Sequence, residues 1–145
     1  MSFIGPLIYS LARLYWFIFR PQTHGVKGML VDGNEILLVR QSYTPNVWSL
    51  PGGRIKRGEQ PLETFQREVR EEINLALSSI QELGGKIFTH EYKKDHVTFF
   101  RAQVTERNFT IDHFEIIEAR WFSLETLPKN IGLVAISGIE LLQHE

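Results

Sequence analysis

The 145-residue sequence contains no cysteine, which excludes disulfide bonds, thiolate zinc sites and cysteine nucleophiles. It also lacks an excess of positive charge, since 16 lysines and arginines stand against 17 acids and the formal net charge is −1. A chain without a broad basic field is poorly suited to grip a nucleic-acid backbone, so we expect no polynucleotide partner. The absence of cysteine is consistent with a reducing compartment, and we expect a cytoplasmic protein.

The sequence has no internal repeat, no linker and no low-complexity stretch. Its length suits one domain, and its composition is 43% hydrophobic, 12% aromatic and 23% charged, close to the globular average. We therefore expect two parts, an N-terminal amphipathic helix over residues 1–20 and a single domain over residues 21–145.

The apolar run over residues 3–19 is short for a transmembrane span and is interrupted by Gly5, Pro6, Ser10 and Arg13. It has neither the preceding cation nor the following cleavage site of a secretory signal. At 100° per residue, its large apolar side chains form one wide stripe. We expect this stripe to pack on the domain or on a twin subunit, the second case giving a homodimer. Contact of residues 3–19 with a membrane surface is the weaker alternative, because the polar face carries little positive charge.

The rest of the sequence alternates between strand, turn and helix signals. Asp32-Gly33-Asn34 predicts a hairpin turn, Pro61 suits the first turn of a helix, and Asn74 suits its end. The predicted strands cover residues 25–31, 35–41, 48–50, 86–92, 96–104 and 118–122. The predicted helices cover residues 61–73, 123–127 and 131–144. This order indicates an α+β fold.

Three glutamates share one side of the helix predicted over residues 61–73. At 100° per residue, Glu71 and Glu72 lie within about 60° of Glu68. Like charges at such spacings destabilise a helix, and a hard divalent cation such as Mg²⁺ would relieve their repulsion. A solvated acidic helix face is the ordinary interpretation of three such glutamates, so the spacing alone leaves both interpretations open.

The residues around these glutamates resemble the Nudix box of the Nudix hydrolase family, whose members include MutT-like proteins. The box here runs from Gly53 through Glu59 to the segment Arg67-Glu68-Val69-Arg70-Glu71-Glu72-Ile73-Asn74-Leu75. The family usually has glycine where this chain has Asn74, and asparagine is the second choice for the left-handed backbone of a helix end. Segments 48–53 and 118–122 extend the resemblance beyond the box.

The resemblance implies an α/β/α sandwich around a mixed β-sheet. It also implies a metal-dependent hydrolase that cleaves a pyrophosphate bond in a nucleoside diphosphate linked to another group, such as a nucleoside triphosphate or a dinucleoside polyphosphate. The implied metal ligands are Glu68, Glu71 and Glu72, with Glu59 as a weaker candidate, and the implied cofactor is Mg²⁺, with Mn²⁺ as the alternative. Arg67 is expected to orient a glutamate. A non-catalytic nucleotide-binding or regulatory module on the same fold is the competing interpretation, against which the three crowded acids argue.

The general base and the substrate contacts follow less directly from the sequence. Nudix enzymes draw the base from the box, here Glu72, or from a later loop, where we rank Glu115 above Glu118 as a base or additional metal ligand. The candidate substrate-binding residues are Arg40, Tyr43, Gly52, Gly53, Arg54 and Tyr92. Aromatic rings accept any nucleobase by stacking, and cations can meet phosphates, although flexible surface cations are common. We expect Trp48 to lie in the core.

Overall fold

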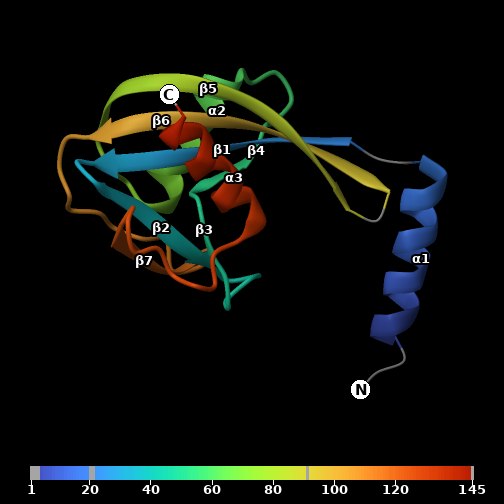
Figure 1. Ribbon diagram of the computed structural model, residues 1–145. Coiled ribbons are helices and arrows are strands. Elements are labelled where there is room, and N and C mark those ends of the chain that lie inside the picture. Colours follow the sequence, from blue (N-terminus) through green and yellow to red (C-terminus); the bar gives the residue numbers. More distant parts are fainter. Residues whose placement is uncertain (1–3, 20–21, 91, 145) are drawn as a thin grey trace.

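The computed structural model describes residues 4–19, 22–90 and 92–144 of the chain. A β-sheet lies between two helices, and a third helix stands apart at one end (Figure 1). The helices are α1 (Ile4–Phe19), α2 (Pro61–Glu72) and α3 (Leu133–Gln143). The strands are β1 (Gln22–Asp32), β2 (Glu35–Gln41), β3 (Trp48–Ser49), β4 (Gly52–Arg54), β5 (Leu77–His90), β6 (Lys93–Val104) and β7 (Ile116–Ser123). The predicted α/β/α sandwich with an added N-terminal helix is confirmed.

Strand β1 organises the sheet because it pairs with three other strands. It runs parallel to β6 and antiparallel to β2 and β4, which makes the sheet mixed. The strand order is β3-β2-β1-β6-β5, with β7 paired to β2 and β4 paired to β1. Because β4 pairs with residues 25–27 of β1, the glycine turn at its start is fixed against the beginning of the central strand.

Two apolar cores lie on opposite faces of this sheet. One core joins α2 to Val26 and Leu30 of β1, and the other joins α3 to Met29 and Val31 of the same strand. Successive side chains of a strand point to opposite faces, so β1 supplies both cores. Burying an apolar side chain of this size contributes about 1.5–3 kcal/mol. Trp48 belongs to the second core and is 6% exposed, as predicted.

The observed elements differ from the predicted ones in three places. Strand β5 begins at Leu77 rather than at residue 86, and its pairing with β6 is interrupted by register shifts near Ser78 and Gly84. These irregularities break the alternation by which a strand is recognised. The short helix predicted over residues 123–127 is wrong, because Ser123 still belongs to β7 and the chain then turns. Strand β4 lies where a turn and a loop were predicted.

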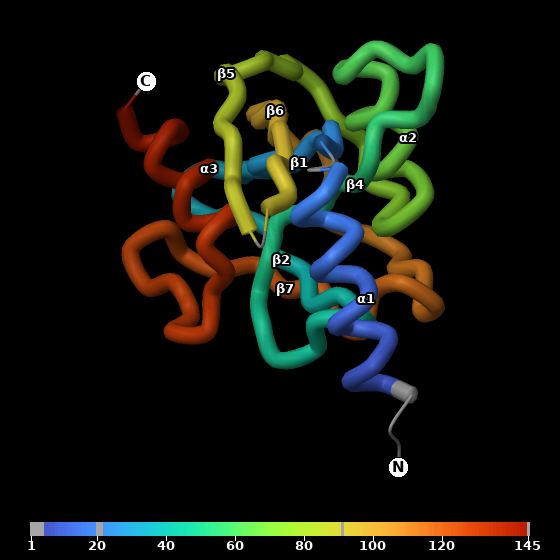
Figure 2. Tube along the Cα trace, turned by 90° about the vertical axis from the view of Figure 1, so that its right-hand side faces the viewer, coloured from blue at the N-terminus to red at the C-terminus, as the bar shows by residue number. Residues whose placement is uncertain are grey.

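Helix α1 forms as predicted, but its apolar stripe does not pack on the domain. Leu7, Leu11 and Ile18 remain 60%, 57% and 59% exposed. The helix stands away from the sheet in Figure 1 and lies in front of it in Figure 2, where that side faces the viewer. Packing of this stripe on the domain, one of the two arrangements expected from the sequence, is therefore wrong. Among the described residues, no helix has the length and apolarity needed to cross a membrane.

Candidate active site

Helix α2 carries the acidic residues, and the local sequence fixes both of its ends. Pro61 occupies the first turn, where its missing N–H costs no intrahelical hydrogen bond. Glu63 accepts a hydrogen bond from the backbone N–H of Gln60 at 2.9 Å, which closes that turn. At the other end Asn74 has φ of 47°, and its N–H donates to the carbonyl of Val69 at 2.9 Å. The predicted left-handed end at asparagine is confirmed.

Glu72 is the most buried acid of this helix, at 2% exposure. Its Oε1 accepts a hydrogen bond from the backbone N–H of Gly52 at 2.9 Å. Gly52 has φ of 153°, and a Cβ there would lie 2.0 Å from the carbonyl oxygen of Val26, so the position requires glycine. Burial raises the pKa of Glu72 to about 8, against the opposing effects of the Lys27 ammonium and the Gly52 N–H.

Glu68 lies one helical turn before Glu72, and its carboxylate rests against the backbone of Gly53. A Cβ at Gly53 would lie 2.5 Å from the carboxyl carbon of Glu68, so a side chain there would displace the carboxylate. Burial raises the pKa of Glu68, and a hydrogen bond from Arg67 opposes this effect. Gly52 and Gly53, the first two residues of β4, therefore each contact one carboxylate, that of Glu72 and that of Glu68 respectively.

Arg67 connects the remaining acids of the box. Its Nε donates to Glu59 at 2.6 Å, and its Nη1 donates to Glu68 at 2.9 Å and to Glu71 at 3.2 Å. Glu59 also accepts a hydrogen bond from the buried hydroxyl of Thr64 at 3.0 Å. The hydrogen bond from Arg67 is the largest cause that lowers the pKa of Glu59 to about 2. This network holds the arginine where it orients Glu68, the kind of role that the resemblance implies for it.

Glu115 reaches the helix from a loop that is distant in sequence. The N–H of Asp112 donates to the carbonyl of Glu72 at 2.9 Å, and the N–H of Glu115 donates to the carbonyl of Asp112 at 3.1 Å. The carbonyl of Glu115 in turn accepts a hydrogen bond from the N–H of Ser42 at 2.8 Å. Backbone hydrogen bonds to the end of α2 and to the residue after β2 thus hold the 112–115 turn in place.

The carboxylates of Glu68, Glu72 and Glu115 form one cluster, in which a ligand oxygen from each lies within 4.8 Å of the others. The charge of Glu115 contributes to the raised pKa of both Glu68 and Glu72, because neighbouring carboxylates disfavour each other's ionisation. A set of crowded carboxylate oxygens is the donor type that hard divalent cations such as Mg²⁺ prefer. The three residues therefore fit a divalent cation. Glu71, 52% exposed and paired with Arg67, lies outside this cluster.

Glu118 and Arg40, two further candidates from the sequence, neutralise each other instead. Glu118 accepts hydrogen bonds from Nη2 and Nε of Arg40 at 2.7 and 3.1 Å, and it also pairs with Arg120. The hydrogen bond from Arg40 is the largest cause that lowers the pKa of Glu118. Arg40 also donates to the carbonyl of Pro45 at 2.7 Å. Neither residue belongs to the carboxylate cluster or to the cavity beside it.

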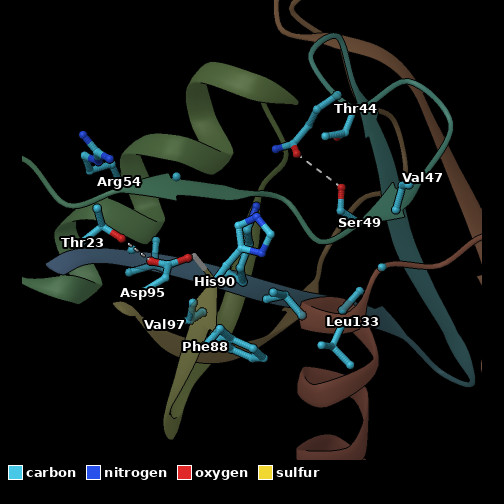
Figure 3. Close-up of a pocket in the computed structure, with 18 of the residues that line it drawn as sticks. Thr23, Thr44, Val47, Ser49, Arg54, Phe88, His90, Asp95, Val97 and Leu133 are labelled. Atoms are coloured by element: carbon cyan, nitrogen blue, oxygen red, sulfur yellow. Dashed lines mark hydrogen bonds between the residues drawn. The ribbon is translucent and has the colours of Figure 1, made fainter. Parts of the chain in front are cut away.

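A cavity of about 580 Å³ opens beside the cluster, between β1, β6, the end of β5 and the start of α3 (Figure 3). Lys27 and Gly53 line it at the end next to Glu72 and Glu68. Phe88, Val97 and Leu133 contribute apolar walls. Its size is typical of pockets for small molecules, which combine apolar walls with a few polar groups.

Lys27 is a charged residue in the apolar central strand and links the cavity to the cluster. Its Nζ donates to the carbonyl of Leu50 at 3.2 Å. Burial lowers the pKa of Lys27, and the nearby carboxylates of Glu72, Asp95 and Glu68 oppose that effect. Asp95 also lines the cavity. Lys27 thus lies on the cavity wall near the cluster, where its ammonium would meet an anionic ligand.

Of the other substrate-binding candidates, the structure places three on the cavity wall and one outside it. Tyr43 and Arg54 line the cavity together with Gly53, and Tyr43 is 72% exposed at its rim. Tyr92 does not line it, and its ring instead packs edge-on against Phe17 of α1 with a centroid distance of 5.0 Å.

Two polar residues of this cavity, Lys27 and Asp95, were not predicted from the sequence. Lys27 carried a usable signal, since a charged residue inside the strand pattern Gly25 to Val31 is unusual. Asp95, which accepts a hydrogen bond from Thr23 at 2.8 Å, carried none. It was placed in a hairpin connection, and only the parallel pairing of β1 with β6 brings it beside Thr23.

Comparison with known proteins agrees with this architecture. A family model described as the NUDIX domain matches residues 21–142. A curated relative, the NAD-capped RNA hydrolase NudC of Pseudomonas aeruginosa (strain LESB58), is 29% identical over 101 residues, which cover 69% of this chain and 36% of that protein. The chain thus spans about a third of the length of the curated relatives that it matches.

Solved structures show the same fold. A MutT NUDIX hydrolase from Burkholderia pseudomallei superposes with a TM-score of 0.76 at 21% identity, covering 83% of this chain and 98% of that one. A UDP-X diphosphatase superposes with a TM-score of 0.72 at 26% identity, covering 85% of this chain and 62% of that one. A MutT protein from Methanosarcina mazei Go1 is also 26% identical, with a TM-score of 0.65 and coverage of 86% and 95%.

Proposed function

The chain belongs to the NUDIX domain family, and on that premise we propose that it hydrolyses a pyrophosphate bond in a nucleoside diphosphate linked to another group, in a metal-dependent reaction. The observation that carries the proposal is the cluster of Glu68, Glu72 and Glu115 beside a cavity of ligand size. When all three carboxylates are ionised they repel one another, and a bound divalent cation would relieve that repulsion.

Glu68 and Glu72 would hold the divalent cation, with the carboxylate of Glu115 beside it, and Arg67 keeps Glu68 in position. Bound there, Mg²⁺ supplies positive charge to the phosphate oxygens and makes a coordinated water a stronger nucleophile. Glu71 and Glu59 are further ligands that the resemblance implies, and both are within reach of the same arginine. Mn²⁺ suits the same oxygen donors.

Other residues of the chain bind the phosphates and the nucleoside and accept a proton. Lys27 contacts a phosphate at the junction of cluster and cavity, where it offsets charge on the diphosphate. Glu115 accepts the proton of the attacking water, because it is the exposed member of the carboxylate cluster. The nucleoside or the linked group occupies the apolar part of the cavity near Phe88 and Leu133, with Tyr43 and Arg54 at its rim.

The test is product analysis on a substrate panel with Mg²⁺, with Mn²⁺ and with EDTA. The panel holds nucleoside triphosphates, dinucleoside polyphosphates and ADP-ribose. It adds UDP-sugars and NAD, free and as an RNA cap, because two of the similar proteins are described as a UDP-X diphosphatase and an NAD-capped RNA hydrolase. We expect metal-dependent release of a nucleoside monophosphate from one of the small-molecule substrates. The net charge of −1 gives the protein little attraction for RNA. Binding without turnover on every member would instead indicate a non-catalytic nucleotide-binding module.

A further inference from the structure

Helix α1 exposes seven large apolar side chains on one side. These residues, named here the apolar stripe, are Leu7, Ile8, Leu11, Leu14, Tyr15, Ile18 and Phe19, and each is 52–64% exposed. At 100° per residue they lie within an arc of about 140°. Scattered apolar residues on a surface need no explanation, but a continuous patch of this kind marks a surface that binds a partner.

The other side of α1 is attached to the hairpin between β5 and β6. The ring of Phe17 packs against Tyr92 at 5.0 Å, and the Nζ of Lys93 lies 4.1 Å from the centre of the Trp16 ring. Around the helix, Trp16 and Phe17 lie outside the arc of the apolar stripe. The hairpin therefore contacts the helix on its other side, and the side chains of the stripe stay exposed.

We propose that the apolar stripe of α1 binds the surface of a lipid bilayer that contains anionic lipids, and thereby holds the hydrolase domain at the membrane. The width of the stripe favours a lipid surface over a second helix. A second helix would cover the narrow seam Leu7, Leu11, Leu14 and Ile18, whose 4-3-4 spacing is that of a coiled coil. It would leave the side chains beside that seam exposed, and 16 residues give little more than two heptads of contact. A lipid surface covers the whole arc.

Charge and residue type also favour a lipid surface. The polar side of α1 itself carries one cation, Arg13, and the adjoining hairpin adds Lys93 and Lys94 next to Asp95. Cations next to a membrane-bound segment are attracted to the headgroups of anionic lipids. Tyr9 and Trp16 are residue types that favour the boundary between hydrocarbon and water.

The length of α1 also suits binding at a lipid surface. Sixteen helical residues extend about 24 Å, which is less than the roughly 30 Å of a bilayer's hydrocarbon core. The helix therefore suits shallow insertion along one leaflet, with its hairpin side toward water.

The test is flotation of the 145-residue protein with vesicles of phosphatidylcholine, with and without phosphatidylglycerol. The variant Leu11→Asp places a charge in the stripe, and the matched control Ser10→Asp places the same charge on an exposed position outside it. We expect Leu11→Asp to lower the partition coefficient on neutral vesicles about tenfold or more, because it removes the burial of one leucine and desolvates a carboxylate. Ser10→Asp should stay within about twofold of wild type. Far-UV circular dichroism and metal-dependent hydrolysis report that both variants are folded.

Charge is tested separately with Lys94→Gln, which should weaken binding about fivefold on anionic vesicles and leave neutral vesicles unaffected. Equal effects of Leu11→Asp and Ser10→Asp, or no flotation of wild type on either vesicle, would overturn the proposal. Light scattering without lipid measures the oligomeric state of wild type and Leu11→Asp. A wild-type dimer that Leu11→Asp converts to a monomer would show that the stripe binds a second copy of the chain, and this result would also overturn the proposal.

Discussion

The buried carboxyl group of Glu72 makes the stability of the metal-free protein depend on pH. Its pKa is about 8 in the folded protein and near 4.5 in an unfolded chain. Between these values the folded state keeps a proton that the unfolded state has released, so the free energy of unfolding falls as pH rises. Urea denaturation in EDTA at about pH 5 and pH 8 should show a larger loss for wild type than for Glu72→Gln, which cannot ionise. The same pH dependence in both proteins would contradict this role of burial.

A second residue-scale prediction separates the two glutamates of the later loop. Glu115 joins the carboxylate cluster, whereas Glu118 is neutralised by Arg40 and Arg120. Glu115→Gln should lower kcat by about 10²-fold or more, because a positioned base contributes 10²–10⁴-fold. Glu118→Gln should change kcat by less than about threefold. Steady-state kinetics across pH checks both, and a larger loss at Glu118 would reverse the assignment.

At the scale of elements, the sequence predicted those that depend on local signals. Pro61 and Asn74 marked the ends of α2, and Gly33 marked the hairpin after β1, because each signal lies within a few residues of its effect. The first half of β5 was missed, since its pairing with β6 is interrupted by bulges and depends on contacts distant in sequence. Glu115 was ranked first among the later acids, but only tertiary hydrogen bonds to the end of α2 bring it to Glu72.

The turn that leads into β4 carries a prediction at the same scale. Gly52→Ala places a Cβ 2.0 Å from the carbonyl oxygen of Val26 in a backbone conformation that disfavours side chains. It should lower the free energy of unfolding by more than about 2 kcal/mol. The control is Gly33→Ala, which also has positive φ but meets nothing within 4 Å and should cost about 1 kcal/mol. Urea denaturation measures both, and equal losses would show that the close approach at Gly52 is unimportant.

At the scale of the whole molecule, the division at residues 20 and 21 stays a prediction that deletion can test. The stripe of α1 packs on neither core, and the family match begins at residue 21. A chain without residues 1–19 should therefore keep its metal-dependent activity within about twofold and its melting temperature within about 4 °C. Calorimetry and the hydrolysis assay provide the comparison. A cooperative loss of both would mean that α1 is part of the domain.

The most direct test of the central claim is turnover of the preferred panel substrate as a function of Mg²⁺ concentration in Glu72→Gln. The matched control is Glu82→Gln, an exposed acid on β5 outside the carboxylate cluster. The account predicts that Glu82→Gln follows wild type, whereas Glu72→Gln loses about 10²-fold or more in kcat and needs far more Mg²⁺ to reach its maximum. Equal activity of the two variants at every Mg²⁺ concentration would contradict a metal centre at Glu72 and the hydrolytic mechanism built on it.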